Sequence, residues 1–162
     1  MSDFRELMSH CAKSVYILTT NFDGNLRLTT ISSVVSLEVD DAKPQILFIA
    51  KLGLASELQK FHEGSFFISL LSSKQKHVAE LCSKNERQKK DFELLIHQSS
   101  SKDIIEISES IFTLECKMMD ALQSQTNEVI IAGVIGWEAR ESNLSPLVHY
   151  RRSYLTVNCL AL

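Results

Sequence analysis

A series of short β-type segments, separated by turn residues and interrupted only briefly by helical patterns, constrains the fold of this chain most strongly. Strand patterns are predicted at residues 15–20, 26–33, 46–50, 66–71, 113–118 and 129–137, and in a final strand from Pro146 through Leu155. Asp23-Gly24, between the first two strands, is typical of a hairpin turn. Because strands and helices do not alternate regularly, the pattern favours a closed antiparallel barrel over a doubly wound parallel sheet.

Three short helices are predicted around this barrel. Apolar residues at helical spacing over 4–11 indicate an amphipathic helix that plugs or flanks a sheet. A second helix covers 54–61 and ends at Gly64. The S-x-x-Q pattern from Ser72 to Gln75 is a capping box that opens a third helix. Gly133 and Gly136, inside one long strand, indicate a bulge or bend of the kind that barrels need.

Composition excludes several classes of function. The 162 residues fit one domain, and the net charge of −3 lacks the basic excess that nucleic-acid binding requires. The charged N-terminus is unlike a secretory signal, and no apolar run approaches the roughly 20 residues of a membrane span. The four cysteines form no CxxC pair, so no metal site is expected. We therefore expect a soluble cytoplasmic protein.

Three further segments have simple interpretations. The charge run at 85–90 is predicted to be a solvated helix face or loop, and the polar stretch at 98–102 a surface segment able to act as a lid. The terminal Cys159-Leu160-Ala161-Leu162 has the form of a prenylation signal but lacks the polybasic stretch that usually accompanies one.

The common short motifs of nucleotide-binding, hydrolytic and metal-dependent enzymes do not occur in the chain. The remaining feature is a hydroxyl-rich stretch from Thr29 to Ser36. Its hydroxyls and backbone N–H groups suit an anionic or heteroaromatic ligand in a polar pocket. The ordinary preference of Thr for strands and of Ser for strand ends also explains them, and composition alone favours this simpler interpretation. The residues alone leave both interpretations open.

Several segments together resemble the flavin reductase-like family. The matching segments, in chain order, are FRELM (4–8), VYILTT (15–20), TISSVVSL (30–37), FFISLLS (66–72) with Gln75, and PLVHYRRSY (146–154). They span nearly the whole chain in the family's order. This family comprises FMN-binding split barrels, which are Greek-key antiparallel six-stranded barrels, and includes the reductase components of two-component flavin monooxygenases.

The resemblance implies a single domain over 1–162 that holds FMN in a groove near a homodimer interface. The implied cofactor-binding residues are Thr30, Ser32, Ser33, Ser36, Lys51, Tyr150 and Arg151. Thr30, Ser32 and Ser33 would hold the edge of the flavin ring. Lys51 would supply charge to the phosphate, or it is an ordinary exposed lysine. Tyr150 and Arg151 would pack beside the cofactor, or would form the closing strand and a dimer contact.

Departures from the family pattern affect the expected activity. Thr126-Asn127-Glu128 replaces a common Gly-Asp-His triplet, Leu28 stands near a common glycine, and Ser69 replaces an asparagine. The predicted function is a flavin reductase that passes hydride from NAD(P)H to FMN and needs no side chain as acid or base. The reduced flavin would then serve a partner monooxygenase or another acceptor. Alternatives are a non-enzymatic FMN-binding electron carrier and, less favoured, an enzyme of the pyridoxamine phosphate oxidase type.

Overall fold

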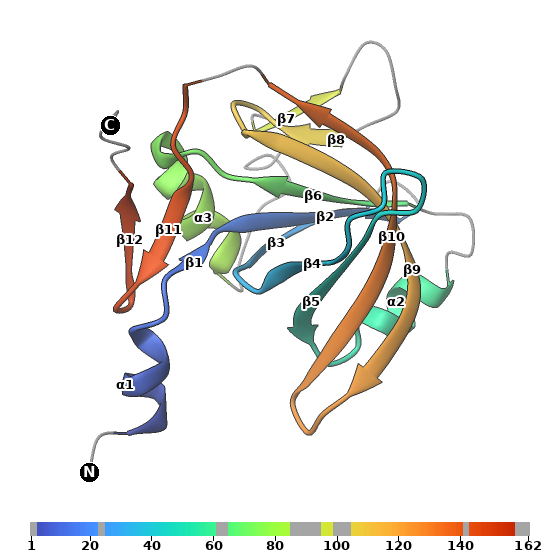
Figure 1. The fold of residues 1–162 in the computed structure, drawn as a ribbon, viewed down its shortest axis with the longest axis horizontal. Coiled ribbons are helices and arrows are strands. Elements are labelled where there is room, and N and C mark those ends of the chain that lie inside the picture. The colour runs from blue at the N-terminus through green and yellow to red at the C-terminus, as the bar shows by residue number, and fades with distance from the viewer. Residues whose placement is uncertain are drawn as a thin grey trace.

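The computed structural model describes residues 3–22, 25–60, 65–84, 95–98, 105–140 and 143–157. Its helical elements are α1 (Phe4–Ser9), α2 (Leu54–Lys60), the short 3-10 helix η1 (Ser73–Gln75) and α3 (Lys76–Ser83). Its strands are β1 (Lys13–Ser14), β2 (Tyr16–Phe22), β3 (Asn25–Ile31), β4 (Val34–Glu38), β5 (Gln45–Lys51), β6 (Phe66–Leu70), β7 (Ile96–Gln98), β8 (Ile105–Ile107), β9 (Phe112–Gln123), β10 (Asn127–Ala139), β11 (Leu147–Tyr150) and β12 (Ser153–Thr156). The chain is thus mainly β, as predicted (Figure 1).

The main sheet is antiparallel throughout and runs in the order β3-β2-β6-β9-β10-β5-β4. It curls so strongly that Ile31 on β3 and Phe48 on β5, from opposite ends of the strand order, join one buried cluster (Figure 1). The sheet has seven strands rather than the six predicted. The reason is that Val34–Glu38, expected only to continue an extended path, pairs with β5 as a strand of its own.

Alternating side chains of these strands fill the barrel. Phe48 and Phe66 are fully buried there, with ring centroids 5.7 Å apart, which is typical of a favourable aromatic pair. Cys116 lies in the same cluster, where burial, with a smaller contribution from the charge of Glu115, raises the pKa of its thiol to about 12. Because the thiolate is the reactive form, Cys116 is a packing residue.

A second core lies outside the β2–β3 wall, between that wall and α3. Its buried members are Val15, Ile17, Leu28, Leu71, Val78, Ala79, Cys82, Ile107 and Leu147. Leu28 is fully buried in it, which explains why a large side chain fits at this position. Gln75 accepts a hydrogen bond from the Ser72 N–H (2.8 Å) and donates one to the Ser108 carbonyl (2.6 Å), so the predicted capping role of Gln75 is confirmed.

The predicted single strand after Pro146 is wrong. The segment forms two strands, β11 and β12, joined by a tight turn at Arg151 and Arg152, whose φ angles are 48° and 62°. This hairpin packs against α1. The Arg151 N–H donates to the Ser9 carbonyl (2.8 Å), and the Arg152 guanidinium lies 3.3 Å from the Glu6 carboxylate.

Helix α1 and the glycine-containing strand otherwise form as expected. The apolar stripe of α1, however, is not buried: Phe4, Leu7 and Met8 are all exposed. The β9–β10 pairing shifts register between Ile131 and Ala132 and again between Val134 and Gly136, which confirms the predicted irregularity. Sequence patterns missed the short β7–β8 hairpin.

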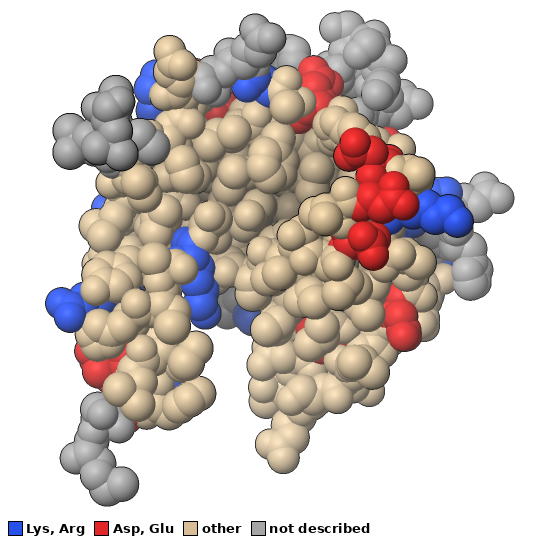
Figure 2. All heavy atoms as spheres, in the orientation of Figure 1, with Lys and Arg blue, Asp and Glu red and all other residues tan. Residues whose placement is uncertain are grey.

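Some predictions fall on residues outside the described ranges. These are the turn at Asp23-Gly24, the helix end at Gly64, the charge run at 85–90, residues 99–102 of the polar stretch, and the terminal tetrapeptide. Within the described ranges, no helix is both long and apolar enough to cross a membrane. Figure 2 shows acidic side chains gathered over the β4–β5 turn, where Glu38, Asp40 and Asp41 are exposed.

Candidate functional site

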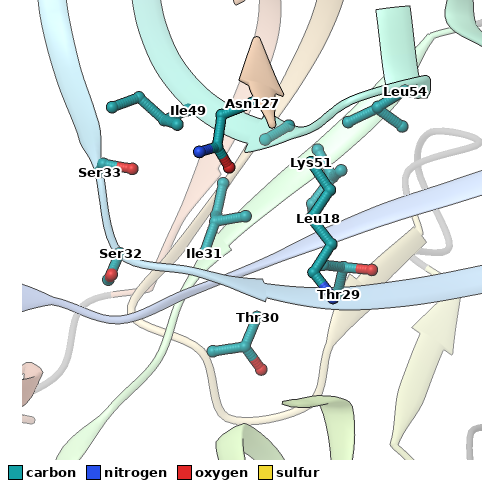
Figure 3. Close-up of a pocket in the computed structure, with 11 residues that line it drawn as sticks. Leu18, Thr29, Thr30, Ile31, Ser32, Ser33, Ile49, Lys51, Leu54 and Asn127 are labelled. Carbon is teal, nitrogen blue, oxygen red and sulfur yellow. The ribbon is translucent and has the colours of Figure 1, made fainter. Parts of the chain in front are cut away.

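The candidate site is a cavity of about 280 Å³ where the curled sheet splits. Strand β4 pairs with β5 only along Gln45–Phe48, and β3 is an edge strand. The end of β5 therefore faces β3 without a strand between them, and Ser32-Ser33 crosses from β3 to β4 at one side of the gap. The cavity is lined by Leu18, Thr29, Thr30, Ile31, Ser32, Ser33, Ile49, Ala50, Lys51, Leu54 and Asn127 (Figure 3).

The hydroxyl side chains of β3 point in different directions because strand side chains alternate between faces. Figure 3 shows Thr29 turned toward Lys51 and Thr30 turned to the other side of the strand. The Thr30 hydroxyl donates to the Ala79 carbonyl of α3 at 2.9 Å. Thr30 thus lines the cavity while its hydroxyl serves the packing of α3. Thr29, absent from the predicted set, presents a hydroxyl at the cavity instead.

Lys51 and Asn127 provide the polar wall opposite the two serines. They are direct partners in the β5–β10 ladder, and the Asn127 side chain projects between Ser33 and Lys51 in Figure 3. Lys51 is exposed and makes no ion pair with any described residue, so its charge is available to a ligand. Asn127 was not among the predicted binding residues. Its position in the triplet that replaces Gly-Asp-His was the signal that could have identified it.

The cavity combines apolar walls with a polar rim. Leu18, Ile31 and Leu54 offer surfaces against which a flat ring can pack. Since the facing edges of β3 and the end of β5 have no strand between them, backbone N–H and C=O groups there are available to pair with polar atoms at a ring edge. These residues fit a planar heteroaromatic group carrying an anion.

The volume lies just under the range of roughly 300–1,000 Å³ that ligand pockets usually span. The cavity of one chain would therefore enclose only part of a flavin nucleotide. Figure 2 shows the molecule notched between the lobe that carries α1, β11 and β12 and the lobe that carries β9 and β10. The β3–β4 connection and the end of β5 lie beside this notch in the same orientation (Figure 1).

Four predicted residues come together at the cavity and three do not. Thr30, Ser32, Ser33 and Lys51 line it. Ser36 lines a different cavity, of about 250 Å³, which includes Trp137 and lies toward the start of β5. The strand β4 carries Ser36 away from Ser33, toward the far end of the barrel.

Tyr150 and Arg151 line neither of these two cavities. The Tyr150 ring lies 6.4 Å from the His10 ring, and the Arg151 guanidinium lies 5.5 Å from the centre of the Tyr150 ring. Both residues thus lie at the hairpin turn and contact the end of α1 and His10, which follows it. The turn at Arg151, which the predicted single strand did not include, is the reason that they sit there.

Comparison with known proteins gives a consistent result. The family model described as "Flavin reductase like domain" matches residues 8–158. A curated relative from Rhodococcus opacus, the reductase component of 4-nitrophenol 4-monooxygenase/4-nitrocatechol 2-monooxygenase, is 28% identical over 152 residues, covering 93% of this chain and 77% of the relative.

Two solved structures share the fold. The styrene monooxygenase flavin reductase of Pseudomonas putida S12 superimposes with a TM-score of 0.84 at 22% identity, covering 99% of this chain and 100% of that one. The NADH:FAD oxidoreductase SgcE6 of Streptomyces globisporus C-1027, solved with NAD and FAD fragments, gives a TM-score of 0.82 at 14% identity, covering 97% and 92%. Because the family model covers nearly the whole chain, this protein belongs to the flavin reductase-like domain family and is an oxidoreductase of the flavin reductase type.

Proposed function

We propose that the protein transfers hydride from NAD(P)H to FMN held in the cavity at the split of the barrel. The observation that carries the proposal is the convergence of Ser33, Asn127 and Lys51 around an apolar cavity between two strand edges. Bound FMN would supply the two-electron acceptor, since hydride passes from nicotinamide C4 to flavin N5. The chain itself needs only to bind both rings in contact and exclude water.

Each side of the cavity has a part in this arrangement. Leu18, Ile31 and Ile49 would pack against the ring system, and the Ser32-Ser33 connection would hydrogen-bond its polar edge. Lys51 would attract the phosphate. Thr29 and Asn127 extend the predicted set of binding residues. Since the Thr30 hydroxyl bonds to α3, Thr30 would meet the flavin only through its backbone.

We further propose that the active form is a homodimer that completes the cavity. Two rows of apolar side chains cross the outer face of the sheet, as the strand register shows: Leu122–Val129–Ile49 on β9, β10 and β5, and Ile131–Leu47–Val35 on β10, β5 and β4. Leu122 is 63% exposed, Val35 55% and Ile49 44%, and Ile49 also lines the cavity. An exposed apolar face of this kind usually marks an interface.

The physiological acceptor we propose is a monooxygenase that uses the reduced flavin. The Rhodococcus opacus relative is the reductase component of such a system, which supports the same role here. We place the reaction in the cytoplasm. Cys11 and Cys116, which both lie in the described part of the chain, are free thiols, which suits a reducing compartment.

A second candidate is an FMN-binding electron carrier that does not turn over NAD(P)H. It is favoured by one observation: Glu128, at the position of the family's histidine, is fully buried and does not line the cavity. An oxidase of the pyridoxamine phosphate type is less favoured, because Lys51 is the one basic side chain among the described residues that line the cavity.

Oxidation of NAD(P)H by the purified protein distinguishes the reductase from the electron carrier. We expect the purified protein, mixed with FMN and either NADH or NADPH, to consume the nicotinamide absorbance band at a rate proportional to protein concentration. Parallel titrations with FMN, FAD and riboflavin give the preferred flavin. Tight yellow binding of FMN without nicotinamide oxidation would establish the carrier instead, and no binding of any flavin would contradict both.

The role of Lys51 is testable in the same titrations. Lys51→Glu should weaken FMN by about tenfold or more, because an attractive charge at the phosphate becomes repulsive, while riboflavin, which lacks the phosphate, changes little. Lys43→Glu, the same change at an exposed position in the β4–β5 turn, is the matched control. Equal losses for FMN and riboflavin would remove Lys51 from the phosphate site.

A further inference from the structure

Glu128 is a charged residue in an unusual place, fully buried near the start of β10. Its Oε1 accepts a hydrogen bond of 2.6 Å from the Ala55 N–H, and its Oε2 has no hydrogen-bond partner among the described residues. Burying a carboxylate is costly unless its contacts compensate. The bond to Ala55 is the compensation for burial that the described residues provide.

The contact of Glu128 fixes one end of a bend that forms a wall of the cavity. The bend runs from Lys51 to Leu54, both of which line the cavity, and Ala55 follows in the first turn of α2. Gly53 within it has φ of 105°, a left-handed conformation that side chains other than glycine rarely adopt. The path of the bend thus depends on a glycine at this position.

Three consecutive residues contact this bend: Thr126, directly before β10, and Asn127 and Glu128, the first two residues of β10. Thr126 accepts from the Leu52 N–H at 3.3 Å, Asn127 pairs with Lys51 in the ladder, and Glu128 accepts from Ala55. The bond from Ala55 to the Glu128 side chain is shorter than the bond from Leu52 to Thr126, and it joins the bend to the barrel interior. Residues 126–128 therefore contact the Lys51–Ala55 segment at Lys51, Leu52 and Ala55.

We infer that Glu128 is a positioning residue, which sets the location of Lys51 at the flavin phosphate by anchoring the far end of the bend. The inference rests on the proposed function, since it assumes that Lys51 meets the phosphate. Glu128 acts through the Ala55 N–H and does not touch the ligand, so it is not a catalytic residue. Where the family commonly has an imidazole, this chain has a structural carboxylate.

Two substitutions separate the contact from the charge. Glu128→Asp keeps the charge but withdraws the carboxylate from Ala55, whereas Glu128→Gln keeps an acceptor oxygen within reach but removes the charge. The readout is the ratio of FMN to riboflavin affinity, measured by flavin titration, because a loss of general stability weakens both ligands alike. Glu57→Gln is the control, since it removes an exposed ion pair with Arg27 from the same helix without touching the bend.

We expect the ratio to fall about tenfold in Glu128→Asp, the consequence of losing a hydrogen bond to a charged acceptor. In Glu128→Gln it should fall about threefold, because a neutral acceptor is roughly half as strong. Glu57→Gln should leave it unchanged. If the Asp variant does not fold, the Gln variant decides by itself: a ratio equal to that of the unaltered protein overturns the inference.

Two further outcomes would also overturn it. One is a larger fall for Gln than for Asp, which would make the charge rather than the contact responsible. The other is a fall of the same size in Glu57→Gln. Failure of the proposed function looks different, because the unaltered protein would then bind no flavin or would bind FMN without oxidising NAD(P)H.

Discussion

At the scale of single residues, neighbouring hydroxyl groups on β3 and the connection after it serve separate purposes. The Thr30 hydroxyl bonds to α3, while Ser33 lines the cavity. The pattern Thr-Thr-Ile-Ser-Ser looks uniform in the sequence, yet side chains on a strand alternate between its two faces. One residue's difference in position therefore separates the Thr30 hydroxyl, which bonds to α3, from the Thr29 hydroxyl, which faces the cavity.

Two substitutions should show this separation. Ser33→Leu should abolish FMN binding with little change in stability, since the larger side chain fills a cavity that is only about 280 Å³. Thr30→Val should lower the free energy of unfolding by about 1 kcal/mol, because the Ala79 carbonyl loses its donor, and should leave FMN affinity unchanged. Flavin titration and denaturant unfolding of both variants provide the check. FMN binding by Ser33→Leu at unaltered affinity would exclude the site.

At the scale of elements, the β11–β12 hairpin carries a strained turn. Arg151 and Arg152 both have positive φ, a conformation that is costly for a residue with a side chain and is usually supplied by Asn-Gly in two-residue hairpins. The contacts that the two arginines make with α1 and with Tyr150 stabilise the turn and so oppose this strain. Exposed ion pairs such as Arg152–Glu6 contribute little to stability, so they do not offset it fully.

Replacing Arg151-Arg152 by Asn-Gly should therefore raise the free energy of unfolding by about 1 kcal/mol. FMN affinity should stay the same, because Arg151 lines neither cavity described above. Thermal unfolding and flavin titration test the two statements separately. A large loss of FMN in this variant would restore Arg151 to the binding site, with the cofactor contact made by the hairpin of a second copy.

At the scale of the whole molecule, the cavity and the apolar outer face of the sheet meet at Ile49. A cavity that encloses only part of a nucleotide and opens beside exposed apolar side chains is the arrangement expected of a site completed by a second subunit. Assembly and flavin binding should therefore be linked.

Leu122→Lys places a charge in the apolar row at a position that is already exposed, so the fold should survive. We expect this variant to be monomeric in light scattering at concentrations where the unaltered protein is dimeric, with FMN affinity reduced about tenfold or more. Val39→Lys makes the same change at another exposed apolar position, on the acidic turn, and should remain dimeric. Monomeric behaviour of the unaltered protein at all concentrations would reject the dimer.

The sequence by itself determined the fold class, most strand positions and the three helices, because hydrophobic period, turn residues and caps are local properties of the chain. The binding role of the hydroxyl-rich stretch was indicated only by the family resemblance. Tertiary structure alone decided which hydroxyl faces the cavity, that Asn127 lies opposite Ser33, and that Glu128 supports the bend at Lys51. In the folded chain, Ser36, Tyr150 and Arg151 lie outside that cavity. The physical reason is that a site forms between segments distant in sequence, and strand register and turn position, which set those meetings, depend on the packed barrel.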